Sequence, residues 1–226
     1  MTYRLPLVGV LFTALVFVST PADAVKIELN DRVVGISGGI NGASVAKVIK
    51  KVLEYESLSH DPIWLLMDSF GGSVEAGFIL IDLMKSIKSP VYVVVVGKAY
   101  SMGAIITIYA EKRYIYRHAT MMLHEASYGA LGEDPSIRSR IGFNTKYLDR
   151  VHDELAKIIE MDVDKYRARI RDAWWAMAED AVKYKWVDGI VTEVVYKKAP
   201  VETIEVKRTR KIKQEKMVRP DAANTP

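Results

Sequence analysis

Ser101 and His124 are the two residues whose types and surroundings best fit nucleophilic catalysis. Ser101 follows an apolar run that is typical of a buried strand, Val91–Val96, and precedes an apolar stretch typical of a helix. A serine at such a strand–turn–helix junction is exposed by the tight turn, and the free N–H groups of the new helix face developing negative charge. A serine before a helix is also a common N-cap residue, which is the alternative interpretation of Ser101.

His124 is one of four histidines, and it alone comes directly after an apolar strand pattern, Ala119–Leu123. Functional sites gather at the carboxyl ends of strands in α/β sheets, so His124 could reach Ser101 and act as its general base. A hydrogen-bonded structural histidine is the other interpretation. The remaining histidines are expected at the surface: His60, His118 and His152.

Gly71 and Gly72 follow a buried strand pattern and precede Ser73. Backbone without side chains can approach a ligand closely, so this segment could supply an oxyanion donor and an edge that pairs with an extended peptide. A plain turn into a helix capped by Ser73 is the alternative.

Strand and helix patterns alternate along the middle of the chain, which predicts an α/β fold with helices covering a largely parallel sheet. The expected strands cover 33–36, 62–67, 91–96, 114–116, 119–123 and 190–196. The expected helices cover 43–57, 74–87, the segment between Ser101 and 110, 135–160, 163–174 and 178–186. Glycine-rich segments at 38–42 and 68–73 are expected to interrupt the chain as turns.

The composition narrows the possible functions. The chain has 226 residues and no cysteine, which excludes disulfide scaffolds, thiolate zinc sites and cysteine nucleophiles. Its formal charge of +4 comes from the C-terminal end, where residues 197–226 carry nine Lys and Arg against four Asp and Glu; residues 25–196 have a net charge of −1. We therefore expect no nucleic-acid partner. The basic end, 199–226, is expected to be either a solvated, disordered tail or a segment that contacts an anionic membrane surface.

The N-terminal segment 1–24 has the features of a secretory signal. It carries one early positive charge, an apolar run of roughly 14 residues and an Ala-x-Ala site that ends at Ala24. The run is short for a membrane span, which needs about 20 residues. We expect either cleavage after Ala24 or retention of the segment as a membrane anchor, and in both cases an exported, periplasmic or secreted domain over 25–198.

Three motifs, in this order and spacing, resemble the proteolytic subunit of the Clp protease, a serine peptidase family: Gly71–Gly77 (GGSVEAG), Ala99–Ala104 (AYSMGA) and Met122–His124 (MLH). The resemblance extends from about Val33 to Val195. It implies a Clp/crotonase-like fold, a spiral of ββα units with a long handle helix at Pro135–Glu160, and a homo-oligomeric ring.

The same resemblance implies the roles of individual residues. Ser101 corresponds to the nucleophile and His124 to the general base, and the backbone N–H groups of Gly71 and Met102 correspond to the oxyanion hole. A peptide or unfolded protein substrate would lie as an added strand along 71–74, which includes Gly72 and Ser73, and along 127–131. The resemblance implies no metal and no cofactor.

The chain also departs from the family pattern. Phe70 stands where the family has proline, and 125–126 reads Glu-Ala where the family usually has glutamine and proline. An ungapped alignment of the C-terminal motif places the family's catalytic aspartate on Ala173. Asp172, one residue earlier, is therefore the candidate that orients His124, and an ordinary surface carboxylate is the alternative.

These residues together predict an exported serine endopeptidase with a Ser-His-Asp mechanism. Because ATP is absent outside the cytoplasm, we expect cleavage of peptides or unfolded segments without ATP. A Ser-Lys dyad peptidase of the signal-peptide-peptidase type, with Lys146 as base, is one alternative. A catalytically inactive ring with the same fold is a second, and acyl-CoA chemistry is a third that the export signal disfavours.

Overall fold

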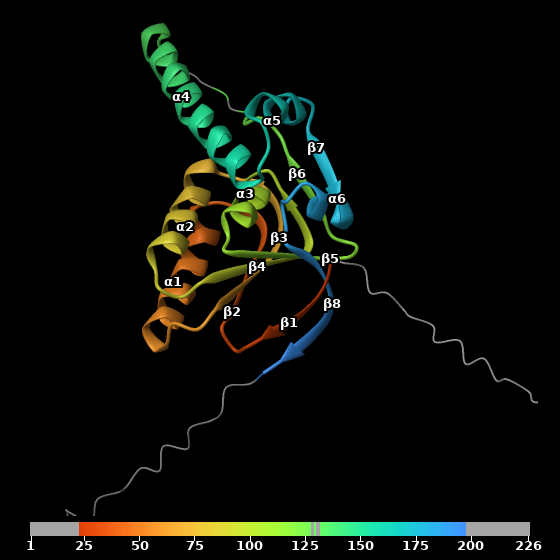
Figure 1. Ribbon diagram of the computed structural model, residues 1–226. Coiled ribbons are helices and arrows are strands. Elements are labelled where there is room, and N and C mark those ends of the chain that lie inside the picture. Colours follow the sequence, from red (N-terminus) through yellow and green to blue (C-terminus); the bar gives the residue numbers. More distant parts are fainter. Residues whose placement is uncertain (1–22, 128, 130–131, 198–226) are drawn as a thin grey trace, which may run out of the picture.

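An eight-stranded, mostly parallel sheet organises the part of the chain that the structure describes. This computed structural model describes residues 23–127, 129 and 132–197 (Figure 1). The strands are β1 (Ala24–Leu29), β2 (Val33–Ile40), β3 (Ile63–Gly72), β4 (Val91–Tyr100), β5 (Lys112–Tyr116), β6 (Thr120–Leu123), β7 (Trp174–Met177) and β8 (Gly189–Tyr196). The helices are α1 (Gly42–Leu58), α2 (Val74–Ser86), α3 (Met102–Tyr109), α4 (Asp134–Ile158), α5 (Val163–Ile170) and α6 (Ala178–Lys183).

The sheet has the order β1-β8-β5-β4-β3-β2, and β6 branches from the end of β4 to pair with β7. Every pair is parallel except β6 with β7. Successive strands joined by helices explain the parallel order, because a parallel connection needs a crossover. The α/β class that the sequence predicts is confirmed.

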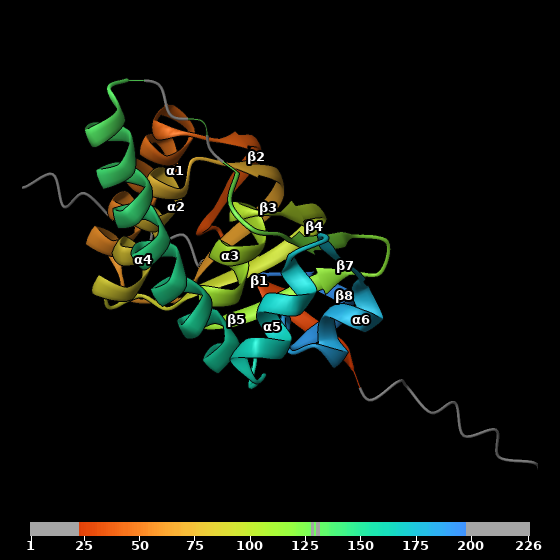
Figure 2. The same cartoon turned by 90° about the horizontal axis from the view of Figure 1, so that it is seen from above.

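The two faces of the sheet are covered differently. Helices α1, α2 and α4 gather on one side of the sheet (Figure 2), and alternate residues of β4, namely Val91, Val93 and Val95, belong to the core cluster on that side. Val94 belongs to a smaller cluster with Ile27 of β1 and with Trp64. Both faces of the central strand are therefore buried, which explains its unbroken apolar run.

Strands β2 and β3 run through the glycine segments that the sequence predicts to be turns. Gly38 and Gly39 belong to β2, and a register shift between them lets the strand continue to pair with β3 through Gly72. Gly38 adopts φ +77°, a conformation that glycine reaches without a steric penalty. The turn prediction is wrong here because ladder hydrogen bonds outweigh the weak strand propensity of glycine.

Two strands were not expected. β1 pairs in parallel with β8, so the two ends of the described chain lie together. β7 begins at Trp174, the last residue of a segment expected to be helical, because α5 stops at Ile170 and the chain then pairs antiparallel with β6. Both are short strands whose partners are far away in the sequence, so local patterns carry little information about them.

Helix α4 is the predicted handle helix, and its N-terminal part projects from the body (Figure 1). Only its C-terminal part is buried, at Val151, His152, Leu155 and Ala156. The surface position expected for His152 is wrong, because α5 packs against this part of α4 and leaves His152 9% exposed. His60 and His118 are exposed, as predicted.

The predicted terminal segments fall almost entirely outside the described residues. Of 1–24, only Asp23 and Ala24 are described, and Ala24 is the first residue of β1. The basic segment 199–226 lies wholly outside them. Among the helices that are described, none has the length and apolar character needed to span a membrane.

Candidate active site

Ser101 lies at the junction between β4 and α3 with a strained backbone. Its φ of 52° and ψ of −120° are rare for a residue with a side chain, and such outliers are typical of functional turns. Its N–H donates to the carbonyl of Met122 at 2.7 Å, which fixes the turn against the end of β6. Its side chain makes no capping hydrogen bond to α3, so the N-cap interpretation of the hydroxyl is not supported.

The structure brings His124 to Ser101. The His124 Nε2 atom lies 2.9 Å from the Ser101 Oγ atom. The two residues meet because Tyr100 of β4 pairs with Met122 of β6, which aligns the carboxyl ends of the strands. With its proton on Nδ1, the imidazole can accept the serine hydroxyl proton at Nε2, as a general base must.

Asp172 is not brought to this pair. It lies exposed in the turn after α5, and no hydrogen bond or ion pair joins it to another described residue. The last pair of the ladder is Leu123 with Trp174, so Ala173 is the residue that the same register would place opposite His124. Ala173 also has a positive φ of 63°, which asparagine and aspartate tolerate better than alanine does. Within the described part of the chain, the His124 Nδ1 atom has no hydrogen-bond partner.

Gly71 packs directly against Ser101. A Cβ atom on Gly71 would lie 2.7 Å from the Ser101 Cβ atom and 2.7 Å from the Tyr100 carbonyl oxygen, and 3.2 Å from the Met102 nitrogen. With its φ of +96°, this position accepts glycine only. The two predicted oxyanion donors are therefore both beside Ser101, and the Met102 N–H belongs to the first turn of α3, where helix N–H groups lack helical partners.

The Gly71 N–H is engaged elsewhere, however. It donates to the Ser69 hydroxyl at 3.0 Å, and Ser69 is fully buried. Sequence reasoning did not single out Ser69, although a serine two residues before a glycine is a pattern that forms such a local hydrogen bond.

A cleft of about 540 Å³ is lined by residues that closely follow Gly71 and His124 in the chain, although neither Ser101 nor His124 lines it. Its walls come from 72–75 at the start of α2, from 126–127 after His124, and from α4; the α4 residues are Phe143, Asn144, Tyr147 and Leu148. Ser73 caps α2 by accepting from the Ala76 N–H at 3.2 Å, as its alternative interpretation predicts. The cleft lies between the two segments predicted to hold substrate, of which residues 128, 130 and 131 are outside the described chain.

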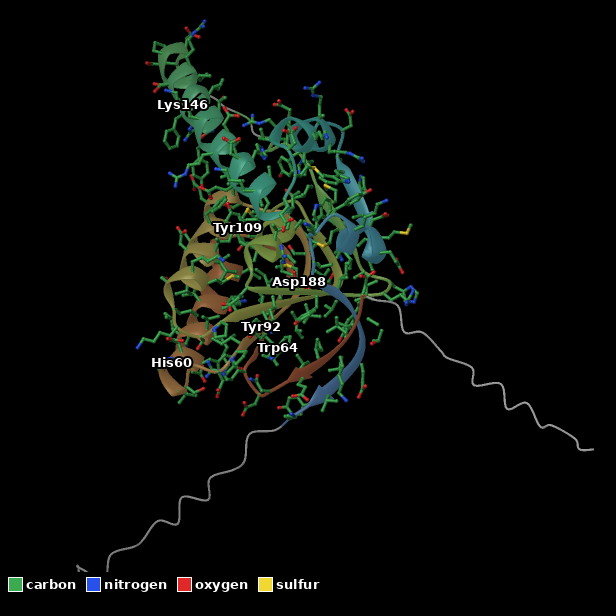
Figure 3. The ribbon with its side chains drawn as sticks, in the orientation of Figure 1. His60, Trp64, Tyr92, Tyr109, Lys146 and Asp188 are labelled. Atoms are coloured by element: carbon green, nitrogen blue, oxygen red, sulfur yellow. The ribbon has the colours of Figure 1, made fainter. Side chains whose placement is uncertain are left out.

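Lys146 does not enter the site. Its side chain is exposed on the projecting part of α4 (Figure 3), and the Ser101 hydroxyl contacts His124 instead. The structure therefore does not support the Ser-Lys alternative. Within residues 23–127, 129 and 132–197, no three histidine or carboxylate side chains are grouped as a metal site would require.

His152 is a buried residue in the C-terminal part of α4. Burial lowers its pKa, and the nearby Arg167 guanidinium lowers it further, although Glu125, Asp149 and Asp153 act in the opposite direction. Its buried Nδ1 atom has no hydrogen-bond partner among the described residues. Arg167 of α5 also binds Asp149 and Asp153 of α4, at 2.6 and 3.0 Å, and so fixes α5 against the handle helix.

The mostly parallel sheet and the long helix α4 are those of the Clp/crotonase-like fold, and the serine–histidine contact lies at adjoining strand ends of that sheet. The Clp protease family model matches residues 20–194, and the chain belongs to this family. It is 31% identical over 172 residues to the ATP-dependent Clp protease proteolytic subunit of Leuconostoc citreum (strain KM20), covering 73% of this chain and 85% of that protein. It is 28% identical over 174 residues to the ATP-dependent Clp protease proteolytic subunit 2 of Treponema denticola, covering 74% of this chain and 82% of that protein.

Proposed function

We propose that this chain is a serine endopeptidase that hydrolyses peptide bonds in peptides or unfolded proteins. The observation that carries the proposal is the 2.9 Å contact between Ser101 Oγ and His124 Nε2 at a strained strand–helix junction. A structural histidine would not need a serine held in a rare backbone conformation.

We propose a group for each step of the reaction. Ser101 Oγ attacks the scissile carbonyl carbon while its proton passes to His124 Nε2, and the imidazolium then protonates the leaving amine. Water hydrolyses the resulting acyl-enzyme with His124 acting as base again. The Met102 and Gly71 N–H groups would stabilise the oxyanion, and each hydrogen bond would lower the activation barrier by about 3 kcal/mol.

Asp172 remains the predicted third member of a Ser-His-Asp mechanism. Its support is its position next to Ala173, which lies beside His124. A one-residue shift of the turn before β7 would carry its carboxylate toward the imidazole.

The substrate would bind as an extended strand in the cleft between 72–75 and α4. Glycine backbone at Gly72 offers an edge for pairing, and the aromatic side chains of Phe143 and Tyr147 offer an apolar wall. We propose that these contacts, and not a cofactor, provide the binding energy.

We also propose that the enzyme is exported and works without ATP. The support is the apolar run before Ala24 and its Ala-x-Ala site. The relatives compared above carry names that state ATP dependence. Degradation of an unfolded protein by the purified chain without nucleotide is expected, and a strict requirement for ATP and an unfoldase would contradict this part of the proposal.

A homo-oligomeric ring is the proposed assembly. The projecting part of α4 exposes Ile141 by 41% and Phe143 by 68%, so both apolar side chains are available to contact a neighbouring subunit. The proposed contact of 199–226 with a membrane surface rests on its basic composition alone.

Intact-mass measurement of the full chain after treatment with a fluorophosphonate tests the activity. We expect one adduct that is lost in Ser101→Ala and in His124→Ala, and retained in the exposed-residue controls Ser86→Ala and His118→Ala. Loss in Ser101→Ala alone would remove His124 from the mechanism.

An inactive ring with this fold is the second candidate. Two observations favour it: the His124 Nδ1 atom lacks a partner among the described residues, and the Gly71 N–H is bound to Ser69. Absence of any adduct in an assembled preparation would select this candidate over the peptidase.

A further inference from the structure

Ser69 lies directly beneath the candidate active site. It is a residue of β3 with no exposed surface, and it pairs with Gly38 of β2 and Ala99 of β4. A Cβ atom on Gly103 of α3 would lie 3.5 Å from the Ser69 Cβ atom. Ser69 is thus enclosed by both neighbouring strands and by the helix that begins after Ser101, and a substrate has no access to it.

The Ser69 hydroxyl connects β2 to the proposed oxyanion hole. It donates to the Gly38 carbonyl at 2.5 Å and accepts from the Gly71 N–H at 3.0 Å. Because the acceptor is buried, the Gly71 N–H is directed into the protein and away from the cleft. A single N–H cannot make a strong, near-linear hydrogen bond to Ser69 and to a substrate oxyanion at the same time.

The backbone around Gly71 is suited to a change of orientation. Gly71 has φ +96° and the following Gly72 has φ +150°, and glycine populates several backbone regions at little cost. Rotation of the peptide between Phe70 and Gly71 would turn the N–H outward and the Phe70 carbonyl inward. The Ser69 hydroxyl would still donate to Gly38, so the rotation leaves no buried donor unpaired.

The two oxyanion donors therefore differ in kind. The Met102 N–H is fixed by the first turn of α3, whereas the Gly71 N–H can lie in either of two hydrogen bonds. A substrate strand along 72–74 would contact the backbone next to Gly71 and supply the competing acceptor.

We propose that Ser69 is a positioning residue that holds the Gly71 N–H away from the oxyanion position in the substrate-free enzyme, and that substrate binding turns this N–H outward. The inference rests on the proposed peptidase function. The oxyanion hole then has both donors only when substrate is bound. Part of the substrate's binding energy is used to break the hydrogen bond between the Gly71 N–H and Ser69.

The rate of fluorophosphonate labelling of the full chain tests the inference, because the phosphoryl oxygen of the probe occupies the oxyanion position. In Ser69→Ala the inward orientation leaves the Gly71 N–H without an acceptor, so the outward orientation gains population. We expect labelling to be about two- to tenfold faster than in the unmodified chain. For a peptide substrate, we expect KM to fall by a similar factor while kcat stays unchanged, because binding no longer has to break the Ser69 contact.

Ser89→Ala is the matched control. Ser89 is also buried, at 1% exposed. Its hydroxyl accepts from the Arg32 guanidinium and shares no hydrogen bond with Gly71. It should lose some stability without any gain in labelling rate. Slower or unchanged labelling of folded Ser69→Ala would overturn the inference. Absence of labelling in the unmodified chain would instead contradict the proposed function itself.

A crystal structure of the unmodified enzyme bound to a peptide boronate gives a second test that does not depend on a variant folding. A boronate hydroxyl takes the oxyanion position. We expect the Gly71 nitrogen to lie about 3 Å from that oxygen and to have left Ser69. A Gly71 N–H still bound to the Ser69 hydroxyl in the adduct would overturn the inference.

Discussion

Ala173 lies beside His124, because Leu123 of β6 and Trp174 of β7 form the last pair of an antiparallel ladder. Continuing this register places position 173 opposite His124, and the side chain at that position is only a methyl group. The positive φ of Ala173 is compatible with aspartate.

Ala173→Asp is therefore expected to raise peptide hydrolysis. A carboxylate next to Nδ1 would hold the imidazole in the tautomer that accepts from Ser101 and would stabilise the imidazolium. In serine peptidases with a complete triad, replacing the aspartate lowers kcat by several orders of magnitude. We therefore expect Ala173→Asp to raise kcat by about tenfold or more. Steady-state kinetics on a peptide measure it, and Asp172→Asn is the control for the neighbouring carboxylate. An unchanged or lower kcat in folded Ala173→Asp would contradict this prediction.

Gly71→Ala is expected to abolish labelling of Ser101. The new Cβ atom would collide with Ser101 and with the Tyr100 carbonyl, both at 2.7 Å, and the φ of +96° would be strained for alanine. We expect at least about a hundredfold loss in rate from displacement of Ser101 and of one oxyanion donor. Gly142→Ala is the control, since a Cβ atom there has no neighbour within 4 Å. Equal labelling of both variants would show that the packing of Gly71 on Ser101 does not matter.

The stability of the fold should fall at mildly acidic pH because of His152. Its pKa in the folded state lies below the ordinary value of 6.5, so the unfolded chain binds the proton more tightly. The contribution of neutral His152 is therefore fully present above pH 6.5 and is lost as the pH falls from 6.5 through the lowered pKa. Urea denaturation at pH 7.5 and pH 5 measures the difference.

Two histidine variants separate this effect from general acid denaturation. His152→Leu should reduce the loss of stability between pH 7.5 and pH 5, because the buried side chain no longer titrates. His118→Leu, at an exposed position, should leave the loss unchanged. If the unmodified chain and His152→Leu lost the same stability between pH 7.5 and pH 5, the loss could not be attributed to His152.

Arg32→Met is expected to destabilise the fold strongly. The buried Arg32 guanidinium donates to the carbonyls of Tyr55 and Ser59 and to the hydroxyls of Ser59 and Ser89, so it joins the end of α1 to the loop before β4. Its loss removes these four hydrogen bonds, at about 3 kcal/mol in total. Thermal or urea unfolding measures it. Arg138→Met, on the exposed part of α4, should change stability by less than about 0.5 kcal/mol.

Phe143→Glu is expected to weaken the proposed assembly. Phe143 is exposed on the projecting part of α4, and a charge there would be costly to bury against another subunit. Native mass spectrometry should show smaller assemblies than those of the unmodified chain. Leu58→Glu, at an exposed leucine that ends α1, is the control. An unaltered mass distribution in Phe143→Glu would place the contact elsewhere.

The sequence by itself determined the class of fold and the central pair of the site. Ser101 and His124 were predictable because each follows an apolar strand of its own, and parallel strands bring their carboxyl ends together. The long helix α4 was predictable from its amphipathic pattern. These features depend on local periodicity and on a general rule of sheet geometry.

Only the tertiary structure decided which residue lies beside His124 and which acceptor binds the Gly71 N–H. The first depends on the register of β6 with β7, and the second on whether a buried hydroxyl lies within 3.0 Å. The burial of His152 likewise depends on α5 packing against α4. Pairing register and packing join segments that are distant in the chain, so no local pattern of residues encodes them.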